Sequence, residues 1–370
     1  MSQAVGQAVS QARRRVIIDC DPGIDDAIAL LLAYASPELD VVGVTTVAGN
    51  VGLDQVVDNA LRLCDLIGGA AAATPVLRGY AGPLARALRA PDEPVHGAYG
   101  LGGVEIPAPT RAAHPGHAVD WMAERIRGGA PGEITLIATA PLTNVAALLH
   151  AHPDTRERLA EIVLMGGAAF APGNTTPAAE FNFHADPEAA RYVAEAGVPL
   201  RIVGLDVTRK ALTPLADAEA LIADGTPVTS AAGRMLSHLI ERYARRHGVR
   251  ACAVHDALAV AAAVRPGLLH WTEAWVTVEC AGEFTRGALV ADVHGRTGLP
   301  PNAKVATDVD AEAFRAFLMS RLRGRYGART APAHTAAAPS DPAPSDLVPS
   351  DPASGAAASG AAGPSAVASS

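Results

Sequence analysis

The chain has 370 residues, of which 49% are hydrophobic, and a formal net charge of −8. This length allows a large core and a single domain of about 300 residues. The negative charge, without any long run of Lys or Arg, argues against nucleic acid or an anionic membrane as a partner. No apolar run reaches the ~20 residues that a membrane-spanning helix needs.

The ends of the chain and its cysteines suggest how it is organised and where it works. Residues 1–13 are polar and small and lack the apolar segment of a secretory signal, so we expect a disordered leader. Residues 14–326 are expected to form one catalytic domain, and residues 327–370, rich in Ala, Pro and Ser, a disordered tail. The four cysteines are far apart without CxxC spacing, which favours reduced thiols in a cytoplasmic protein.

The first predicted strand, 15–19, leads into an acidic turn. Val16, Ile17 and Ile18 indicate a buried strand, and Pro22-Gly23 breaks it before an apolar helix from about 25 to 35. Four carboxylates flank this break: Asp19, Asp21, Asp25 and Asp26. Like charges this close raise one another's pKa unless a cation lies among them, and a hard divalent cation with oxygen ligands fits best. An acidic, solvated turn is the simpler alternative.

The segment 19–27, Asp-Cys-Asp-Pro-Gly-Ile-Asp-Asp-Ala, resembles the signature of the nucleoside hydrolases, the inosine-uridine-preferring family that cleaves the N-glycosidic bond of ribonucleosides. The resemblance continues through separated motifs from about residue 15 to 325. It implies an α/β fold with a mostly parallel, open, doubly wound central sheet, helices on both faces, and a site at the carboxyl edge of the strands.

Two segments follow that contribute candidate substrate contacts. A strand at 39–47 and a helix at 53–67 extend the strand-helix alternation of a parallel sheet. Asn50, between them, reads as an ordinary turn residue; the resemblance gives it a sugar contact or an orienting role. The glycine-rich stretch 91–104 is typical of a loop or a closing lid, and its His96 resembles the family's His-Gly-x-x-Gly-Leu segment over the base pocket.

The middle of the chain supplies a possible metal ligand and a possible sugar clamp. A helix is expected at 116–127, a strand at 134–138 and another at 162–165. Thr139 reads as part of a helix-capping turn, whereas the resemblance makes its main-chain carbonyl a metal ligand. The polar stretch 173–182 fits a solvated loop and a sugar-binding loop equally well. The resemblance assigns ribose binding to Asn174, Glu180 and Asn182, with Phe181 as an apolar wall.

The last third contains the remaining candidates. We expect a strand at 199–205, a helical segment at 216–250 carrying Tyr243 beside the base, and an apolar helix that begins near His255-Asp256. By pattern alone this pair is a helix-capping aspartate beside a satisfied histidine. The resemblance makes Asp256 a metal ligand and His255 the acid that protonates the leaving base. An antiparallel hairpin at 271–293, a strand at 304–307 and a helix at 310–323 complete the domain.

The resemblance therefore implies calcium-dependent hydrolysis of a ribonucleoside. Ca²⁺ would be held by Asp21, Asp26, Asp256 and the Thr139 carbonyl, with Asp21 taking the proton of the attacking water. Asp25 would bind the ribose hydroxyls and Asp19 would orient its neighbours. Relatives suggest a homodimer or homotetramer. Two alternatives are a noncatalytic nucleoside-binding protein and a metal-dependent phosphohydrolase; only two lysines, Lys210 and Lys304, are present for the phosphoryl charge that the latter must bind.

Overall fold

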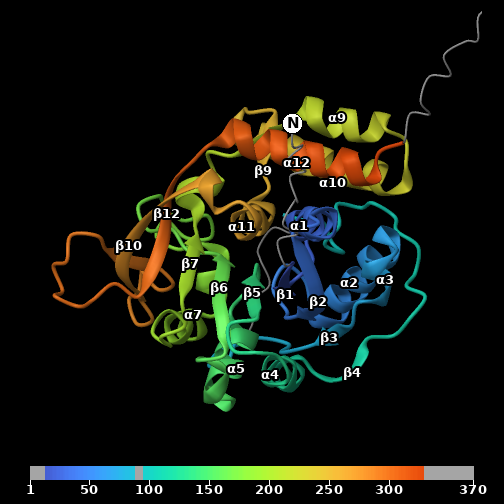
Figure 1. Cartoon of the computed structure of the whole chain (residues 1–370). Coiled ribbons are helices and arrows are strands. Elements are labelled where there is room, and N and C mark those ends of the chain that lie inside the picture. The colour runs from blue at the N-terminus through green and yellow to red at the C-terminus, as the bar shows by residue number, and fades with distance from the viewer. Residues whose placement is uncertain (1–12, 88–94, 329–370) are drawn as a thin grey trace, which may run out of the picture. The chain divides into compact units, whose positions relative to one another are not determined.

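A ten-stranded sheet forms the centre of the structure, a computed structural model that describes residues 13–87 and 95–328 (Figure 1). The predicted leader and tail lie almost wholly outside these ranges. The strand order is β11-β10-β12-β7-β6-β5-β1-β2-β3-β4. The strands are β1 (Arg14–Cys20), β2 (Leu39–Thr46), β3 (Val76–Arg78), β4 (His114–His117), β5 (Ile134–Ala138), β6 (Leu159–Met165), β7 (Leu200–Val203), β10 (Leu269–Val278), β11 (Leu289–Asp292) and β12 (Ala303–Val309). A second, two-stranded sheet joins β8 (Leu212–Pro214) to β9 (Ala251–Ala253).

Pairing within the large sheet is parallel from β4 through to β12. Only β10 runs antiparallel, to β12 on one side and to β11 on the other. The mostly parallel sheet and the appended antiparallel hairpin that the sequence predicted are both confirmed. Parallel strands are buried on both faces, which is why β1 reads as a continuous apolar run rather than an alternating one.

Helices cover both faces of the sheet (Figure 1). Val16 and Ile18 of β1 belong to the larger hydrophobic cluster, and Ile17, between them, belongs to the cluster on the opposite face. The larger cluster contains side chains of α1 (Ile24–Ala35), α2 (Leu53–Ile67), α10 (Pro227–His247), α11 (His255–Val264) and α12 (Ala311–Tyr326). The other contains side chains of α4 (Ala118–Gly128), α5 (Thr143–Ala151) and α7 (Pro187–Ala194). The short helices are α3 (Ala70–Ala73), α6 (Phe181–Ala185), α8 (Leu205–Thr208) and α9 (Leu215–Ala223).

Helices α1 and α11 lie side by side in the larger cluster (Figure 1). Helix α11 has a small-residue surface, because buried alanines occupy much of its length: Ala257, Ala259, Ala261, Ala262 and Ala263. Helix α1 begins directly after β1, at the carboxyl edge of the large sheet, and α11 begins shortly after β9 of the two-stranded sheet, with Asp256 of its first turn close to Asp25 and Asp26 of α1. Their first turns are therefore available to the same site.

The strand order reverses at β1, which pairs with β2 on one side and with β5 on the other. Loops that leave neighbouring strands in opposite directions open a crevice at their carboxyl ends, which is where open α/β sheets bind ligands. The acidic turn follows β1, Thr139 follows β5, and Asn50 follows β2. The topology thus brings three sequence-predicted segments to one point.

Two predicted elements were wrong in extent. The strand predicted at 199–205 ends at Val203, because Leu205 begins the short helix α8. The segment predicted as one helical stretch from 216 to 250 consists of α9 and α10. Gly225 has a left-handed backbone (φ 72°), Thr226 caps α10 through a hydrogen bond from the Thr229 N–H, and Pro227 occupies its first turn. The short strands β3, β4, β8 and β9 were not predicted.

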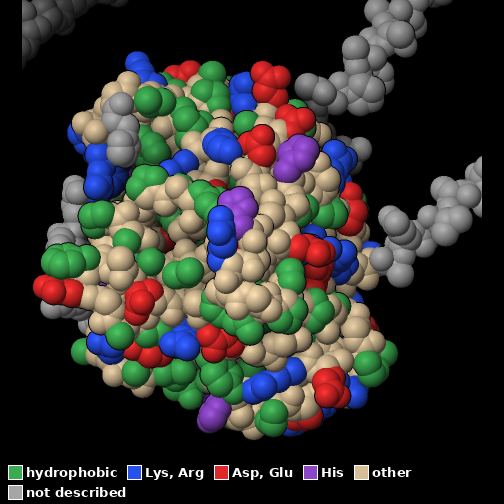
Figure 2. Space-filling model, turned by 90° about the vertical axis from the view of Figure 1, so that its left-hand side faces the viewer, with side chains coloured by type: hydrophobic (Ala, Val, Ile, Leu, Met, Phe, Trp, Pro, Cys, Tyr) green, Lys and Arg blue, Asp and Glu red, His purple; other side chains and the backbone are tan. Residues whose placement is uncertain are grey.

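Two further features concern possible partners. None of the helices in the described ranges is long and apolar enough to cross a bilayer. On the face drawn in Figure 2, basic and acidic side chains are interspersed with apolar ones, so no single sign of charge extends across it.

Candidate active site

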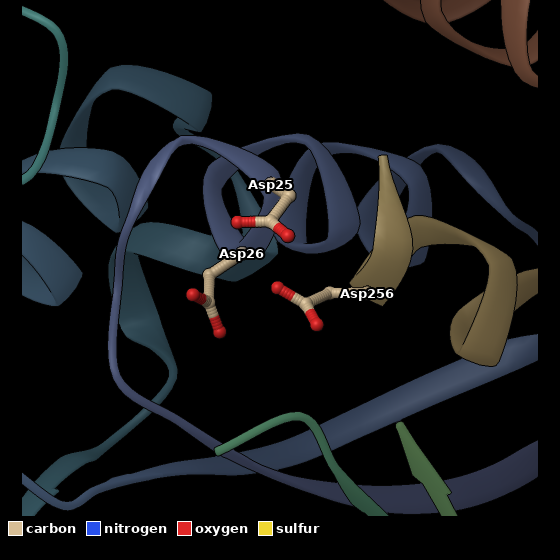
Figure 3. A group of neighbouring side chains, drawn as sticks. All are labelled: Asp25, Asp26 and Asp256. Atoms are coloured by element: carbon tan, nitrogen blue, oxygen red, sulfur yellow. The ribbon is translucent and has the colours of Figure 1, made fainter. Parts of the chain in front are cut away.

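Three buried carboxylates meet where α1 and α11 begin (Figure 3). Asp25 and Asp26 lie in the first turn of α1 and Asp256 in the first turn of α11, and each offers an oxygen within 4.8 Å of the others. Their residues are 8%, 0% and 3% exposed. Helix N-termini carry partial positive charge, so two converging first turns favour anionic groups at this point.

Asp21 lies beside this group and is joined to it by Asn50. The Asn50 backbone N–H donates to Asp21 Oδ2 (2.6 Å), and its side-chain amide donates to the Asp21 carbonyl (3.1 Å) and to Asp26 Oδ2 (3.2 Å). Asp21 was predicted as a metal ligand and Asp25 as a ribose ligand, whereas the cluster of three contains Asp25 and leaves Asp21 at its border. Both roles stay predictions, as does the sugar-contacting or orienting role of Asn50.

Asp19 lies one step further from the cluster. Its Oδ1 accepts hydrogen bonds from the Thr45 hydroxyl (2.6 Å) and the Asn144 amide (2.8 Å). Asn144 also provides the acceptor for the Tyr80 N–H (2.9 Å). Asp19 is therefore fixed by the neighbouring strand β2 and by helix α5, which agrees with a role in orienting the acidic turn.

Thr139 contacts the cluster through its side chain. Its hydroxyl donates to Asp26 Oδ1 (2.9 Å), and its carbonyl accepts a hydrogen bond from the Asn182 amide (3.0 Å). A carbonyl oxygen has a second lone pair, so the predicted ligand role of this carbonyl is compatible with the Asn182 contact. The Thr139 side chain therefore helps to hold Asp26 in place.

Burial dominates the electrostatics of the carboxylates. It raises the pKa of Asp26 to about 7 with a further contribution from Asp25, although hydrogen bonds from Gly23 and Thr139 oppose the rise. Burial also raises the pKa of Asp19 to about 6. The pKa values of Asp21 and Asp256 are raised well above the usual range by burial and by the neighbouring aspartates. A nearby cation would reverse these shifts.

The donor set fits a divalent cation. Within the described residues, the buried oxygens Asp21 Oδ1 and Asp25 Oδ1 have no hydrogen-bond partner. Unpartnered, buried carboxylate oxygens are costly in a folded protein unless a ligand contacts them. The clustered carboxylates of Asp25, Asp26 and Asp256 offer the oxygen ligands that hard divalent cations favour.

The predicted sugar-binding residues lie on and before α6. The Glu180 carboxylate accepts hydrogen bonds from the N–H groups of Gly167, Asn182 and Phe183, and burial raises its pKa to about 7 against these donors. Asn182 is buried and donates to the Thr139 carbonyl. Asn174 is exposed and accepts from the Phe181 N–H (2.9 Å), which leaves its amide N–H groups for a substrate; Phe181 is half-buried.

Two histidines approach the carboxylates from other elements. His96 accepts a hydrogen bond from the Ile24 N–H at Nδ1 (3.0 Å), and this nitrogen lies 3.8 Å from Asp25 Oδ1. His255 precedes Asp256 and has its Nε2 3.4 Å from the Tyr243 hydroxyl. Burial lowers the pKa of both imidazoles, and the charge of Asp25 opposes this. The structure thus brings Tyr243, His255 and Asp25 to one side of the site.

Three supporting residues were missed from the sequence. Asn144 orients Asp19, Asn59 donates to the carbonyls of Pro22 (3.0 Å) and Tyr99 (2.9 Å), and Gly49 packs against Asp21. A Cβ on Gly49 would lie 2.1 Å from Asp21 Oδ2, so only glycine fits. A signal existed for Gly49 and Asn144, because both follow strands at the carboxyl edge; Asn59, inside a helix, gave none.

Known proteins share this fold and much of this sequence. Residues 16–316 match the profile of a family described as inosine-uridine preferring nucleoside hydrolase. The chain is 43% identical to the pyrimidine-specific ribonucleoside hydrolase RihA of Salmonella gallinarum, over 83% of this chain and 98% of that protein. It is 42% identical to RihA of Escherichia coli O17:K52:H18 over the same shares of both chains.

Solved structures agree. The purine-preferring ribonucleoside hydrolase from Gardnerella vaginalis superposes with a TM-score of 0.79 at 32% identity, covering 84% of this chain and 98% of its own. An inosine-guanosine nucleoside hydrolase gives a TM-score of 0.77 at 32% identity, with 84% and 99% covered. The match in sequence and fold extends over the whole described domain, and the chain therefore belongs to the inosine-uridine preferring nucleoside hydrolase family.

Proposed function

We propose that this protein hydrolyses the N-glycosidic bond of ribonucleosides to ribose and free base, with calcium as its cofactor. The observation that carries the proposal is the group formed by Asp25, Asp26 and Asp256, buried at the point where the strand order reverses. Among the residues that the structure describes, Oδ1 of Asp25 and Oδ1 of the neighbouring Asp21 have no hydrogen-bond partner. A histidine, His255, stands directly beside it in the chain. This combination offers a cation site and a proton donor next to each other.

Asp21, Asp26, Asp256 and the Thr139 carbonyl are the residues proposed to hold the ion, with Asp25 directed at the same space. When bound, calcium would lower the pKa of a water molecule and bind ribose hydroxyls. Calcium is proposed over magnesium because an irregular set of protein oxygens suits its larger and more flexible coordination shell.

The remaining side chains have separate proposed roles in proton transfer and in sugar binding. Asp21 Oδ1, which is buried and has no partner among the described residues, is placed to take the proton of the attacking water. Asp25 accepts hydrogen bonds from the ribose hydroxyls, and Asn174, Glu180 and Asn182 hold the rest of the sugar. The bond from the anomeric carbon to the base breaks with its electrons leaving on the base, and His255 supplies the proton that neutralises them.

The substrate base is proposed to be a pyrimidine. The relatives at 42–43% identity are described as pyrimidine-specific, whereas the solved structures at 32% identity are described as purine-preferring or inosine-guanosine enzymes. The higher identity favours uridine and cytidine over inosine. A cytoplasmic location and a homodimer or homotetramer complete the proposal; all four cysteines are unpaired, which agrees with a reducing compartment.

The test measures ribose release from uridine, cytidine and inosine by a reducing-sugar assay. Activity should be highest on the pyrimidines, disappear with a chelator and return with calcium. Asp256→Asn should lower kcat by more than about 100-fold. Removing a residue that only hydrogen-bonds a metal ligand already costs about 10- to 100-fold, and loss of a proposed ligand should cost more. Asp40→Asn, at a half-exposed aspartate away from the site, is the matched control and should change little.

Two results would contradict the proposal. Binding of uridine without release of ribose would identify a nucleoside-binding protein instead. Release of inorganic phosphate from uridine monophosphate, with no release of ribose from uridine, would favour the phosphohydrolase alternative.

A further inference from the structure

The second ring nitrogen of His255 contacts a residue that has no role in the reaction proposed above. His255 Nδ1 lies 2.7 Å from the hydroxyl of Thr208, the last residue of α8, while Nε2 lies 3.4 Å from the Tyr243 hydroxyl. Contacts at the two opposite nitrogens fix the ring plane and decide which nitrogen faces the substrate. We infer that Thr208 is a positioning residue that presents His255 Nε2 to the leaving base; the inference rests on the proposed function.

The turn that carries Thr208 is held in place unusually firmly for a four-residue helix. The Asp206 carboxylate accepts hydrogen bonds from the backbone N–H groups of Ala169 (2.9 Å), Phe170 (2.7 Å) and Ala171 (2.8 Å). Arg209, the next residue after the helix, donates to the carbonyls of Pro172 (2.7 Å) and Gly173 (2.8 Å). Residues 205–209 are thereby fastened to the loop that leads directly to Asn174.

Thr208 itself is only 1% exposed, and its backbone N–H donates to the Gly204 carbonyl (3.1 Å). A buried, β-branched side chain on a fastened turn has little rotational freedom. The hydroxyl therefore keeps a fixed position next to the imidazole, and residues 205–209 also hold the proposed sugar-binding loop. This one short segment consequently fixes the position of His255 relative to the sugar-binding residues.

The chemistry of a hydroxyl suits this position. A threonine hydroxyl can donate one hydrogen bond and accept others. When it donates to Nδ1 of a neutral imidazole, the ring proton must lie on Nε2, the nitrogen on the Tyr243 side. When Nδ1 also carries a proton, the hydroxyl rotates and accepts. A valine at position 208 would keep the shape of the side chain and lose both functions.

The test compares two substrates that differ in their need for a proton. Uridine needs protonation of its base, whereas p-nitrophenyl riboside releases a phenolate that leaves unprotonated. Thr208→Val should lower kcat on uridine by about 10- to 100-fold, as removal of outer partners of active-site groups does, and change kcat on p-nitrophenyl riboside by less than about threefold. Thr208→Ser should restore most of the uridine activity.

Controls separate positioning from general damage to the fold. Thr155→Val removes the hydroxyl of another fully buried threonine, one that donates to the His152 carbonyl, and should leave both activities unchanged. In a His255→Ala background, Thr208→Val should cause little additional loss on uridine, because the side chain that it positions is absent. Thr208→Ala provides a second variant if Thr208→Val does not fold.

Equal losses on both substrates, or full uridine activity in both Thr208→Val and Thr208→Ala, would overturn the inference while leaving the proposed function intact. A wild-type protein that releases ribose from neither substrate would overturn the proposed function and the inference with it. A Thr208→Val effect that is undiminished in the His255→Ala background would also exclude action through His255.

Discussion

At the scale of single residues, the site consists of buried aspartates that suit the binding of a ligand but lower the free energy of unfolding when they are ionised and none is bound. Asp19, Asp21, Asp26 and Asp256 are nearly inaccessible, and burial raises the pKa of each. Without a cation, the folded protein holds protons that the unfolded chain would release. The aspartates themselves were predictable, because their spacing in the acidic turn is visible in the sequence. The hydrogen bonds that Thr45 and Asn144 donate to Asp19, and the contact of Thr208 with His255, were not predictable, because each of these residues comes from a distant segment.

This arrangement predicts an unusual pH dependence of stability for the protein without a bound cation. The folded-state pKa of Asp26 is about 7 against 3.8 for an ordinary aspartate, so its contribution is fully present below about pH 4 and is lost as the pH rises through about 7. A shift of this size corresponds to at most about 4 kcal/mol. In a chelating buffer, the free energy of unfolding measured with urea should fall between about pH 4 and about pH 7.

Asp26→Asn should flatten this fall, because an amide does not titrate, and Asp40→Asn should leave it unchanged. An equally steep fall in Asp26→Asn would show that other groups cause it. Added calcium should raise the stability of the wild type more at the higher pH, where protons no longer compete for the carboxylates.

At the scale of elements, helix and strand type followed from local pattern, and boundaries followed from capping. Helix α2 was predicted with its observed bounds, Leu53–Ile67, from its apolar spacing. The break between α9 and α10 was missed although the sequence contains its signals, Gly225-Thr226-Pro227. Thr226 accepts the N–H of Thr229 (3.2 Å) and donates to the Tyr326 carbonyl (2.8 Å), so it joins the start of α10 to the end of α12.

Thr226→Ala should therefore lower the free energy of unfolding by about 1–2 kcal/mol, because it removes a helix cap and a contact between two helices. The activity on uridine should be unchanged, since α10 keeps its position through the rest of its length. Chemical denaturation measures the first effect and the ribose assay the second. Thr226→Ser, which keeps the hydroxyl, serves as the control. If Thr226→Ser loses as much stability as Thr226→Ala, the effect comes from packing of the threonine methyl group and not from the hydrogen bonds.

At the scale of the whole molecule, the parallel sheet was predictable and its strand order was not. Alternating strands and helices indicate a parallel sheet, but pairing of β1 with β5 joins segments more than a hundred residues apart, and no local pattern specifies it. The short strands β3 and β4 were missed for a related reason: Val76–Arg78 and His114–His117 are too short to show a period. Convergence of the site residues was expected only through the resemblance to a family.

The extent of the catalytic domain is also a property of the whole molecule. The chain divides at Ala328, and every proposed site residue lies between Asp19 and Asp256. A chain that ends at Ala328 should therefore keep the kcat on uridine of the full chain, with a Tm within about 2 °C, a change that for a domain of this size corresponds to less than about 1 kcal/mol. Ribose release and a thermal melt of both chains test this. A lower kcat in the shortened chain would give residues 329–370 a part in the reaction.

The buried alanines along α11 have a consequence for the acidic cluster at its first turn. Asp25 and Asp26 lie on α1 and Asp256 lies on α11, so a change in the separation of these two helices would also change the separation of the three carboxylates. Because protein interiors are close-packed, a larger side chain in place of one of these alanines is expected to disturb the cluster from a distance, without touching it.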